Sequence, residues 1–272
     1  MNIITDTGSL LSIEKAKLLN VDLIPLQVEI NGKNYRDYFE ISTSDYIEEI
    51  KKGIPNSSQP AIGDVMNIFE ANPDGLYIAM TSGLSSTYVS AIGIAQADYP
   101  RVTVFNSKTL AGTQQYLVEL ASHLAKTLDK TEIIKNLEHC LTQCKSYLIP
   151  VDFDYLKRNG RLSTLAALMS GLLKIKPIVY HKPGMEKLDK FGVARTWNQA
   201  IDSIIEDMRK EKVSYDHAIY VSHADNLSIA ELFAKHIQDA FENIEVSINL
   251  LSPVMITQGG PGCVSVQYIL KK

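Results

Sequence analysis

Residues 76–88, LYIAMTSGLSSTY, are an apolar run that breaks into hydroxyl-bearing residues around one glycine. The apolar part has the length and composition of a buried strand, and a helix is expected to begin at Ser86 or Thr87. The free N–H groups of a helix start carry partial positive charge, and the Ser and Thr hydroxyls add neutral donors. Because ligands collect at strand ends in open α/β sheets, the loop is predicted to bind an anionic oxygen.

Similar hydroxyl-rich loops precede two other predicted helices. Asp6–Ser9 follows a short apolar strand, and Ser57–Pro60 precedes the helical stretch 62–71. A glycine-rich loop, Gly259–Gly262, separates the last two strand-like runs. Helix capping explains any one of these loops taken alone, because Ser and Thr are common caps and turn residues. Their recurrence makes anion binding an equal competitor to capping.

The order of the predicted elements indicates an α/β fold. Strand-like and helix-like segments alternate through the first half, which predicts a mainly parallel sheet with helices on both faces. The expected strands are 2–6, 22–30, 76–80, 102–107, 146–152, 177–181, 216–223, 244–251 and 264–270, and the expected helices are 12–19, 43–52, 62–71, 86–97, 109–127, 131–145, 163–174, 196–210 and 227–240. We expect two α/β domains, residues 1–150 and 151–272.

Composition narrows the class of protein. Hydrophobic residues make up 45% of the chain and charged residues 21%, which is typical of a soluble globular protein. No run approaches the roughly 18 apolar residues of a membrane helix, and no signal-peptide pattern opens the chain, so a cytoplasmic protein without integral membrane association is expected. Three cysteines without a matching ligand set predict reduced thiols, no metal and no cofactor.

Charge is distributed unevenly along the chain. The net charge of −4 argues against a nucleic-acid partner. Between Tyr155 and Trp197, however, nine Lys and Arg residues face two acidic residues, a local charge of +7 that leaves −11 elsewhere. A solvated face is the usual outcome of such a run, and a docking or phosphate-facing patch is the alternative.

The segment 162–173 is apolar around most of a helical circumference, which predicts a buried helix. A core helix explains this pattern. Alternatively, one face lines a ligand cavity, with Leu165, Met169 and Leu172 on its wall.

Motifs for catalysis are mostly absent from the sequence. It contains no P-loop, no dinucleotide fingerprint and no nucleophile elbow, and the six histidines do not pair at metal-ligand spacing. Asp6 and His223 are the candidates for a general base in an enzyme that acts on a small carboxylate or phosphate. Many donors without a nucleophile–base pair favour binding over catalysis, so no catalytic residue is predicted.

Seven short motifs occur in the order found in the DegV family, and nearly the whole chain resembles that family. They are TDT (5–7), SSQP (57–60), SGLSSTY (82–88), YLKRNGRLS (155–163), KP (176–177), HADN (223–226) and GPG (260–262). The resemblance implies two α/β domains around a long-chain fatty acid. It also implies a fatty-acid-binding protein, itself not an enzyme, that presents the acyl carboxylate to a separate ATP-dependent fatty acid kinase, which forms an acyl phosphate for phospholipid synthesis.

The resemblance also assigns roles to particular residues. It places the carboxylate on Ser57 and Ser85, and we expect Ser86 and Gln258 to bind the carboxylate with them. It places Arg161 near the domain junction and Arg195 on the surface that faces the kinase. Three departures from the family pattern stand out: Ser86 replaces a usual Gly, Asn159 replaces the first Gly of a GGR motif, and Gln258 replaces the histidine before GPG. A Gln amide still donates to a carboxylate but brings no positive charge.

A third class of function is an adaptor that uses the basic 157–195 face without a ligand.

Overall fold

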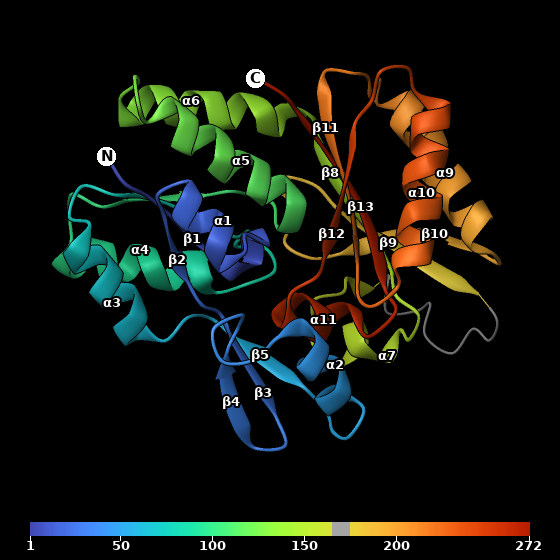
Figure 1. Cartoon of the computed structure of the whole chain (residues 1–272), viewed down its shortest axis with the longest axis horizontal. Coiled ribbons are helices and arrows are strands. Elements are labelled where there is room, and N and C mark those ends of the chain that lie inside the picture. Colours follow the sequence, from blue (N-terminus) through green and yellow to red (C-terminus); the bar gives the residue numbers. More distant parts are fainter. Residues whose placement is uncertain (165–174) are drawn as a thin grey trace.

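The computed structural model describes residues 1–164 and 175–272 (Figure 1). Four strands from the first half of the chain form a sheet in the order β2-β1-β6-β7, and every pair of neighbouring strands in it is parallel. These strands are β1 (Ile3–Asp6), β2 (Val21–Ile24), β6 (Leu76–Ala79) and β7 (Thr103–Asn106). Buried aliphatic side chains along β1 and β6 explain why both faces of this sheet need cover.

Helices cover both faces of the parallel sheet, as the sequence predicts. They are α1 (Ile13–Leu18), α3 (Ile62–Ala71), α4 (Thr87–Asp98), α5 (Ala111–Leu124) and α6 (Lys130–Cys140). Alternate residues of β1 point to opposite faces of the sheet. Ile4 packs with side chains of α3 and α4 on one face, and Ile3 packs with those of α1, α5 and α6 on the other. The predicted α/β class with helices on both faces is therefore confirmed.

A small antiparallel sheet lies beside the parallel one. It contains β3 (Gln27–Ile30), β4 (Lys33–Arg36) and β5 (Asn56–Ser58) in the order β4-β3-β5, with α2 (Thr43–Ile50) between β4 and β5 in sequence. The prediction of one strand over 22–30 is wrong. Pro25 has no N–H for a strand ladder, and the chain changes sheets there. This change positions β5, which carries Ser57.

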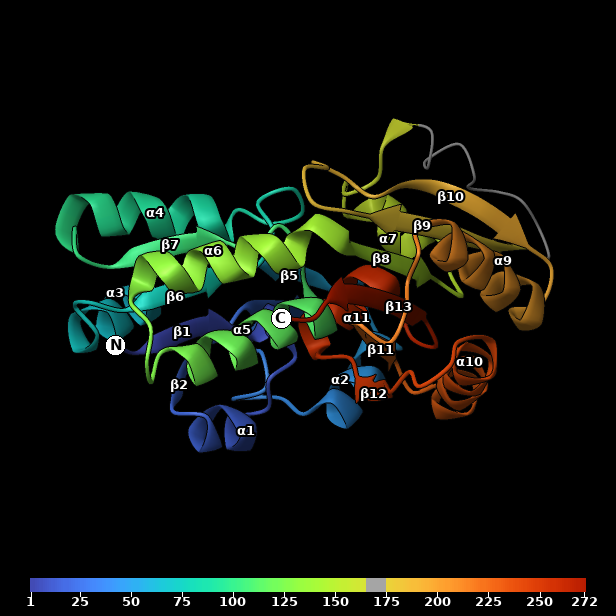
Figure 2. The ribbon, with the colours of Figure 1, turned by 90° about the horizontal axis from the view of Figure 1, so that it is seen from above.

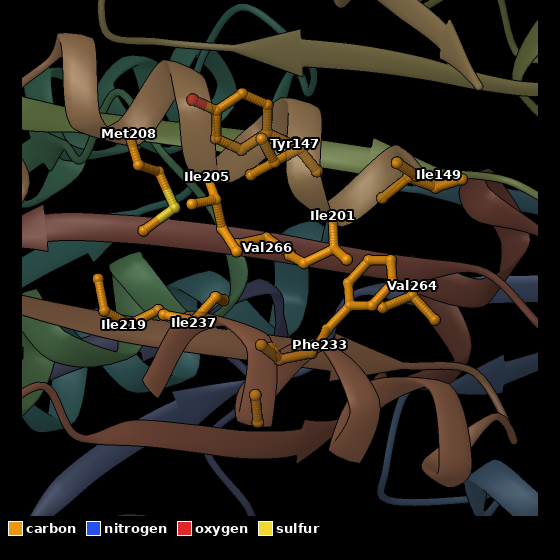
Figure 3. Close-up of a cluster of buried hydrophobic side chains, with 14 of the residues drawn as sticks. Tyr147, Ile149, Ile201, Ile205, Met208, Ile219, Phe233, Ile237, Val264 and Val266 are labelled. Carbon is orange, nitrogen blue, oxygen red and sulfur yellow. The ribbon is translucent and has the colours of Figure 1, made fainter. Parts of the chain in front are cut away.

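The second large sheet is mixed and has the order β10-β9-β8-β13-β11-β12. Its strands are β8 (Cys144–Ile149), β9 (Lys176–His181), β10 (Asp189–Ala194), β11 (His217–His223), β12 (Val246–Leu250) and β13 (Val264–Leu270). Two helices, α9 (Trp197–Lys210) and α10 (Leu227–Ala240), pack on one face (Figure 1). Figure 3 shows the apolar cluster between them and the sheet, which contains Tyr147, Ile205, Phe233 and Val266.

The helix expected over 131–145 is too long. Helix α6 ends at Cys140, a short 3-10 turn η2 (Leu141–Gln143) follows, and β8 begins at Cys144. Pairing of Cys144 with Ile269 of β13 overrides the local helical pattern. The domain boundary near residue 150 stays a prediction, although β8, which precedes it, pairs within the second sheet.

Helix α5 lies between the two large sheets. It packs on β1 and the turn η1 (Thr7–Ser9) on one side, and on β11 and β13 on the other. Figures 1 and 2 place it, together with α11 (Pro253–Gly259), where the two halves meet. At Gly112 the helix approaches β11 so closely that an added Cβ would lie 2.4 Å from the Tyr220 ring.

Replacing Gly112 by alanine is therefore expected to lower the free energy of unfolding by about 1–3 kcal/mol, because the new methyl group overpacks this contact. Gly93→Ala on α4 is the matched control, since its added Cβ would meet nothing within 4 Å apart from the adjacent backbone of its own helix. There the better helix propensity of alanine should stabilise the protein by up to about 1 kcal/mol. Urea unfolding of the two variants checks the opposite signs.

Candidate functional site

A cavity of about 270 Å³ lies where the carboxyl end of the parallel sheet, the small sheet and the six-stranded sheet meet. Its walls are mainly apolar, and they come from both halves of the chain. The apolar wall contains Leu26, Met80, Leu84, Leu110, Leu148, Leu156, Leu188, Leu251, Val254 and Met255. A cavity close to the roughly 300 Å³ lower limit of ligand pockets, apolar with a few polar groups, is suited to an amphipathic molecule.

Ser57 and Gln258 lie together on the cavity wall. Ser57 is on β5, held by the pairing of β5 with β3, and Gln258 is near the end of α11. The Gln258 Nε2 donates to the Ser57 Oγ at 2.8 Å. Because the Ser57 oxygen accepts this bond, its own proton can be donated to a ligand oxygen.

Ser85 and Ser86 bring the start of α4 to the same cavity. The Thr87 amide donates to the Ser85 Oγ at 3.2 Å, and the Ser85 and Thr87 hydroxyl oxygens are 2.8 Å apart. Ser86 is the N-cap residue, yet its hydroxyl makes no capping hydrogen bond. The helix start therefore combines its partial positive charge with hydroxyl donors at the cavity, which suits an anionic oxygen.

The loop before α4 is held against the second half of the chain. A Cβ on Gly83 would lie 2.2 Å from the Met185 carbonyl oxygen, so only glycine allows this approach. Arg161 lines the cavity, and its Nε donates to the Leu84 carbonyl at 3.3 Å. Arg161 thus places a positive charge beside the loop that carries Ser85.

The other predicted sites lie apart from this group. Arg195 is exposed in the turn between β10 and α9, and it does not line the cavity. Leu165, Met169 and Leu172 lie outside the described residues, and so does most of the helix expected over 163–174.

Asp6 is a buried structural carboxylate that does not line the cavity. It accepts hydrogen bonds from the Met80 and Gly8 amides at 2.9 and 3.0 Å and from the Tyr77 hydroxyl at 3.1 Å. Burial raises the pKa of Asp6 to about 6, and these hydrogen bonds oppose the rise. In the same loop, the Thr7 hydroxyl oxygen accepts from the Leu26 amide. The Asp6–Ser9 loop therefore serves the fold, as the capping interpretation expects.

His223 also lies away from the cavity. Its Nδ1 accepts from the Asn226 amide at 3.1 Å, and burial lowers its pKa. The two candidate bases of the enzyme alternative are thus used in local structure. Within residues 1–164 and 175–272, no group of three or more His, Cys, Asp or Glu side chains could hold a metal ion.

Several cavity residues escaped the sequence reasoning. Ser146 on β8, His181 on β9, and Ser265 and Gln267 on β13 line the wall formed by the six-stranded sheet. The alternation of polar and apolar residues along β8 and β13 could have identified three of them, because it places Ser146, Ser265 and Gln267 on one face of the sheet.

Comparison with known proteins gives a family match over the whole chain. A family model described as "Uncharacterised protein, DegV family COG1307" matches residues 1–271. A DegV domain-containing protein of Staphylococcus aureus (strain N315) is 33% identical, with 99% of this chain and 98% of that protein covered. A DegV domain-containing protein of Listeria innocua is 29% identical, with the same coverage of each chain.

Solved structures share this fold. DegV from Bacillus subtilis, described as a fatty acid binding protein, has a TM-score of 0.86 and 26% identity, with 99% of each chain covered. A Thermus thermophilus DegV family protein has a TM-score of 0.89 at 23% identity, with 99% of each chain covered. A stearic-acid-binding protein from Eubacterium ventriosum has a TM-score of 0.87 at 22% identity, covering 99% of this chain and 98% of that one.

Among the helices of the described residues, none has both the length and the apolar composition that a membrane span requires.

Proposed function

The chain belongs to the DegV family, and from this premise we propose that it binds a long-chain fatty acid in the cavity between its two halves. The carboxylate lies at the hydroxyl-rich end, and the hydrocarbon tail follows the apolar walls. The B. subtilis relative, which is described as a fatty acid binding protein, supports this class of ligand.

One observation carries the proposal: Ser57, Ser85, Ser86 and Gln258, which come from three separate elements, all line one mainly apolar cavity. The Ser57 oxygen accepts from Gln258, so the Ser57 hydroxyl can donate its proton to a carboxylate. The start of α4 supplies further donors. Arg161 adds a positive charge nearby. This arrangement matches an ion at one end of a molecule and a hydrocarbon at the other.

Burial of the tail supplies most of the binding free energy. About 15 methylene groups at roughly 0.8 kcal/mol each give about 12 kcal/mol before the costs of association. Loss of translational and rotational freedom takes back about 4 kcal/mol or more. The remainder is enough for tight binding, while the polar end sets the orientation of the acid.

The direct test is mass spectrometry of an organic extract from the purified protein. We expect a fatty acid of about 14–18 carbons in near-equal molar ratio to protein, because a chain of that length carries the methylene groups counted above. An extract without lipid, from protein that also fails to bind added oleate, would contradict the proposal. A bound sugar or nucleotide would contradict it as well.

We further propose that the loaded protein presents its acyl carboxylate to an ATP-dependent fatty acid kinase. Arg161 at the cavity and the exposed Arg195 are the residues assigned to the partner-facing side. Both belong to the chain segment with an excess of basic residues, which suits an acidic or phosphate-bearing partner surface.

Arg195→Glu is expected to lower the rate of acyl-phosphate formation with such a kinase at least tenfold, because a like charge would oppose docking. The affinity for the acid should not change, since Arg195 does not line the cavity. The control is Lys235→Glu on α10, an exposed position outside this segment with the same change in charge. Equal kinase rates in both variants would argue against a role for Arg195 in docking.

A further inference from the structure

The six-stranded sheet packs one face on α9 and α10, and its other face mixes polar with apolar side chains. Tyr147, Ile149 and Val266 point toward α9 and α10 in the cluster of Figure 3. The alternate residues Ser146 and Gln267, directly paired across β8 and β13, point the other way and line the cavity. Polar side chains on the wall of an apolar cavity require partners, because a buried polar group without a hydrogen bond destabilises the protein.

Gln267 has a structural use that accounts for its presence. Its Oε1 accepts from the Gly112 amide at 2.9 Å, and its Nε2 donates to the Leu110 carbonyl at 3.0 Å, so it anchors the start of α5. The same Nε2 donates to the Ser146 Oγ at 2.7 Å. Because the Ser146 oxygen accepts this bond, the Ser146 hydroxyl is oriented to donate its own proton to another group.

His181 lies opposite Ser146 on the neighbouring strand β9 and is 1% exposed. Its Nε2 is 3.0 Å from the Met185 carbonyl oxygen. A carbonyl can only accept, so Nε2 carries the proton and Nδ1 keeps a free electron pair. Burial also lowers the pKa of His181, which favours this neutral form. The Nδ1 atom is buried and has no hydrogen-bond partner among the described residues.

Ser146 and His181 therefore form a donor and an acceptor on adjacent strands. Directly opposite residues have Cβ atoms about 4.5–5.5 Å apart, a spacing that one oxygen can bridge between two polar side chains. Ser265, diagonal to Ser146 on β13, adds a second buried hydroxyl oxygen that lacks a partner within the described chain. A turn about a single side-chain bond moves a serine hydroxyl between its staggered positions, so these groups can adapt to a ligand.

We propose that the cavity accepts fatty acids that carry a hydroxyl group on the acyl chain, and that Ser146 and His181 bind this hydroxyl. The ligand hydroxyl accepts from Ser146 and donates its proton to the His181 Nδ1, so both of these side chains gain a partner. This inference rests on the proposed function, because the carboxylate end must be held as described above. It adds a second polar contact that selects among fatty acids.

The test compares octadecanoic acid with octadecanoic acids that carry one hydroxyl at successive positions from the second carbon to mid-chain. Affinity of the delipidated protein for each acid is measured by calorimetry. At least one hydroxy acid should bind about tenfold more tightly than the parent acid, since its hydroxyl satisfies two buried groups. Ser146→Ala and His181→Phe should each remove this preference, and the first variant keeps the test decisive if the second does not fold.

Ser222→Ala is the matched control. Ser222 pairs with Ser265 on the same face of the sheet, and its hydroxyl is also buried without a partner in the described chain, but it does not line the cavity. The control should keep the preference for the hydroxy acid. The inference is overturned if octadecanoic acid binds and no hydroxy acid binds more tightly. That result would mean that water, and not a ligand hydroxyl, bonds to Ser146 and His181. Failure of every acid to bind would instead refute the proposed function itself.

Discussion

Replacing Ser57 and Ser85 together by alanine is expected to weaken oleate binding at least a hundredfold while the fold is retained. Each hydroxyl is assigned one hydrogen bond to the carboxylate, and a hydrogen bond to a charged group contributes about 1.5–3 kcal/mol. The Gln258 amide, which donates to the Ser57 Oγ, would also lose its acceptor. Isothermal titration calorimetry with delipidated protein measures the change, and circular dichroism verifies the fold.

The Ser85 substitution has a second effect, because the Ser85 Oγ accepts from the Thr87 amide at the start of α4. Loss of this local hydrogen bond costs about 0.5–1.5 kcal/mol of stability. Ser12→Ala is the matched control: the Ser12 Oγ caps α1 by accepting from the Lys15 amide at 3.1 Å, far from the cavity lining. Oleate affinity that is equal in the control and the double variant would refute the proposed carboxylate site.

The second large effect concerns the dependence of stability on pH. Asp37 is fully buried between the small sheet and α11, where its Oδ1 accepts from the Val254 amide at 3.3 Å. Burial raises the pKa of Asp37 to about 7, although hydrogen bonds favour the charged form. The neighbouring Asp6 carboxyl, with its pKa raised to about 6, adds to the rise.

These shifts make the folded chain bind protons more tightly than the unfolded chain between about pH 4 and pH 7. The free energy of unfolding should therefore fall as pH rises across this window, by roughly 4 kcal/mol from Asp37. Asp37→Asn removes the titrating group and should flatten most of the slope. Urea unfolding of delipidated protein from pH 4 to pH 8 gives both curves.

Asp216→Asn is the control for the loss of one carboxyl group, because Asp216 is exposed. Its pH profile should follow that of the unmodified protein. A slope that is unchanged in Asp37→Asn, or a stability that rises with pH between pH 4 and pH 7, would show that Asp37 is charged at little cost in the folded chain.

Local patterns were sufficient to predict much of the fold. The strand at 76–79 and the helix at 87–98 follow from the run of apolar residues and the hydroxyl-rich loop at their junction. The small sheet was missed, because its short strands β4 and β5 have no buried residue and pair only through contacts with β3. Strand β10 was missed for a similar reason, since only one of its six residues is buried.

In the candidate site, too, features set by neighbouring residues could be predicted, and contacts between residues far apart in the chain could not. The hydroxyl loops at Ser57 and Ser85 were visible in the sequence, because they interrupt apolar segments at helix starts. The approach of Gln258 to Ser57, residues 201 positions apart, depends on how α11 packs against the small sheet. His181 gave no signal, because a single histidine at the end of a strand is ordinary until its unpaired nitrogen is located.

The position of α5 between the two large sheets has a consequence for how the molecule loses its structure. Neither half can melt alone without exposing the apolar side chains that α5 buries against both, such as Leu117 on α5 and Ile269 on β13. Heating should therefore give one cooperative transition with equal calorimetric and van't Hoff enthalpies, and a fragment cut after α6 should aggregate rather than persist as an autonomous unit.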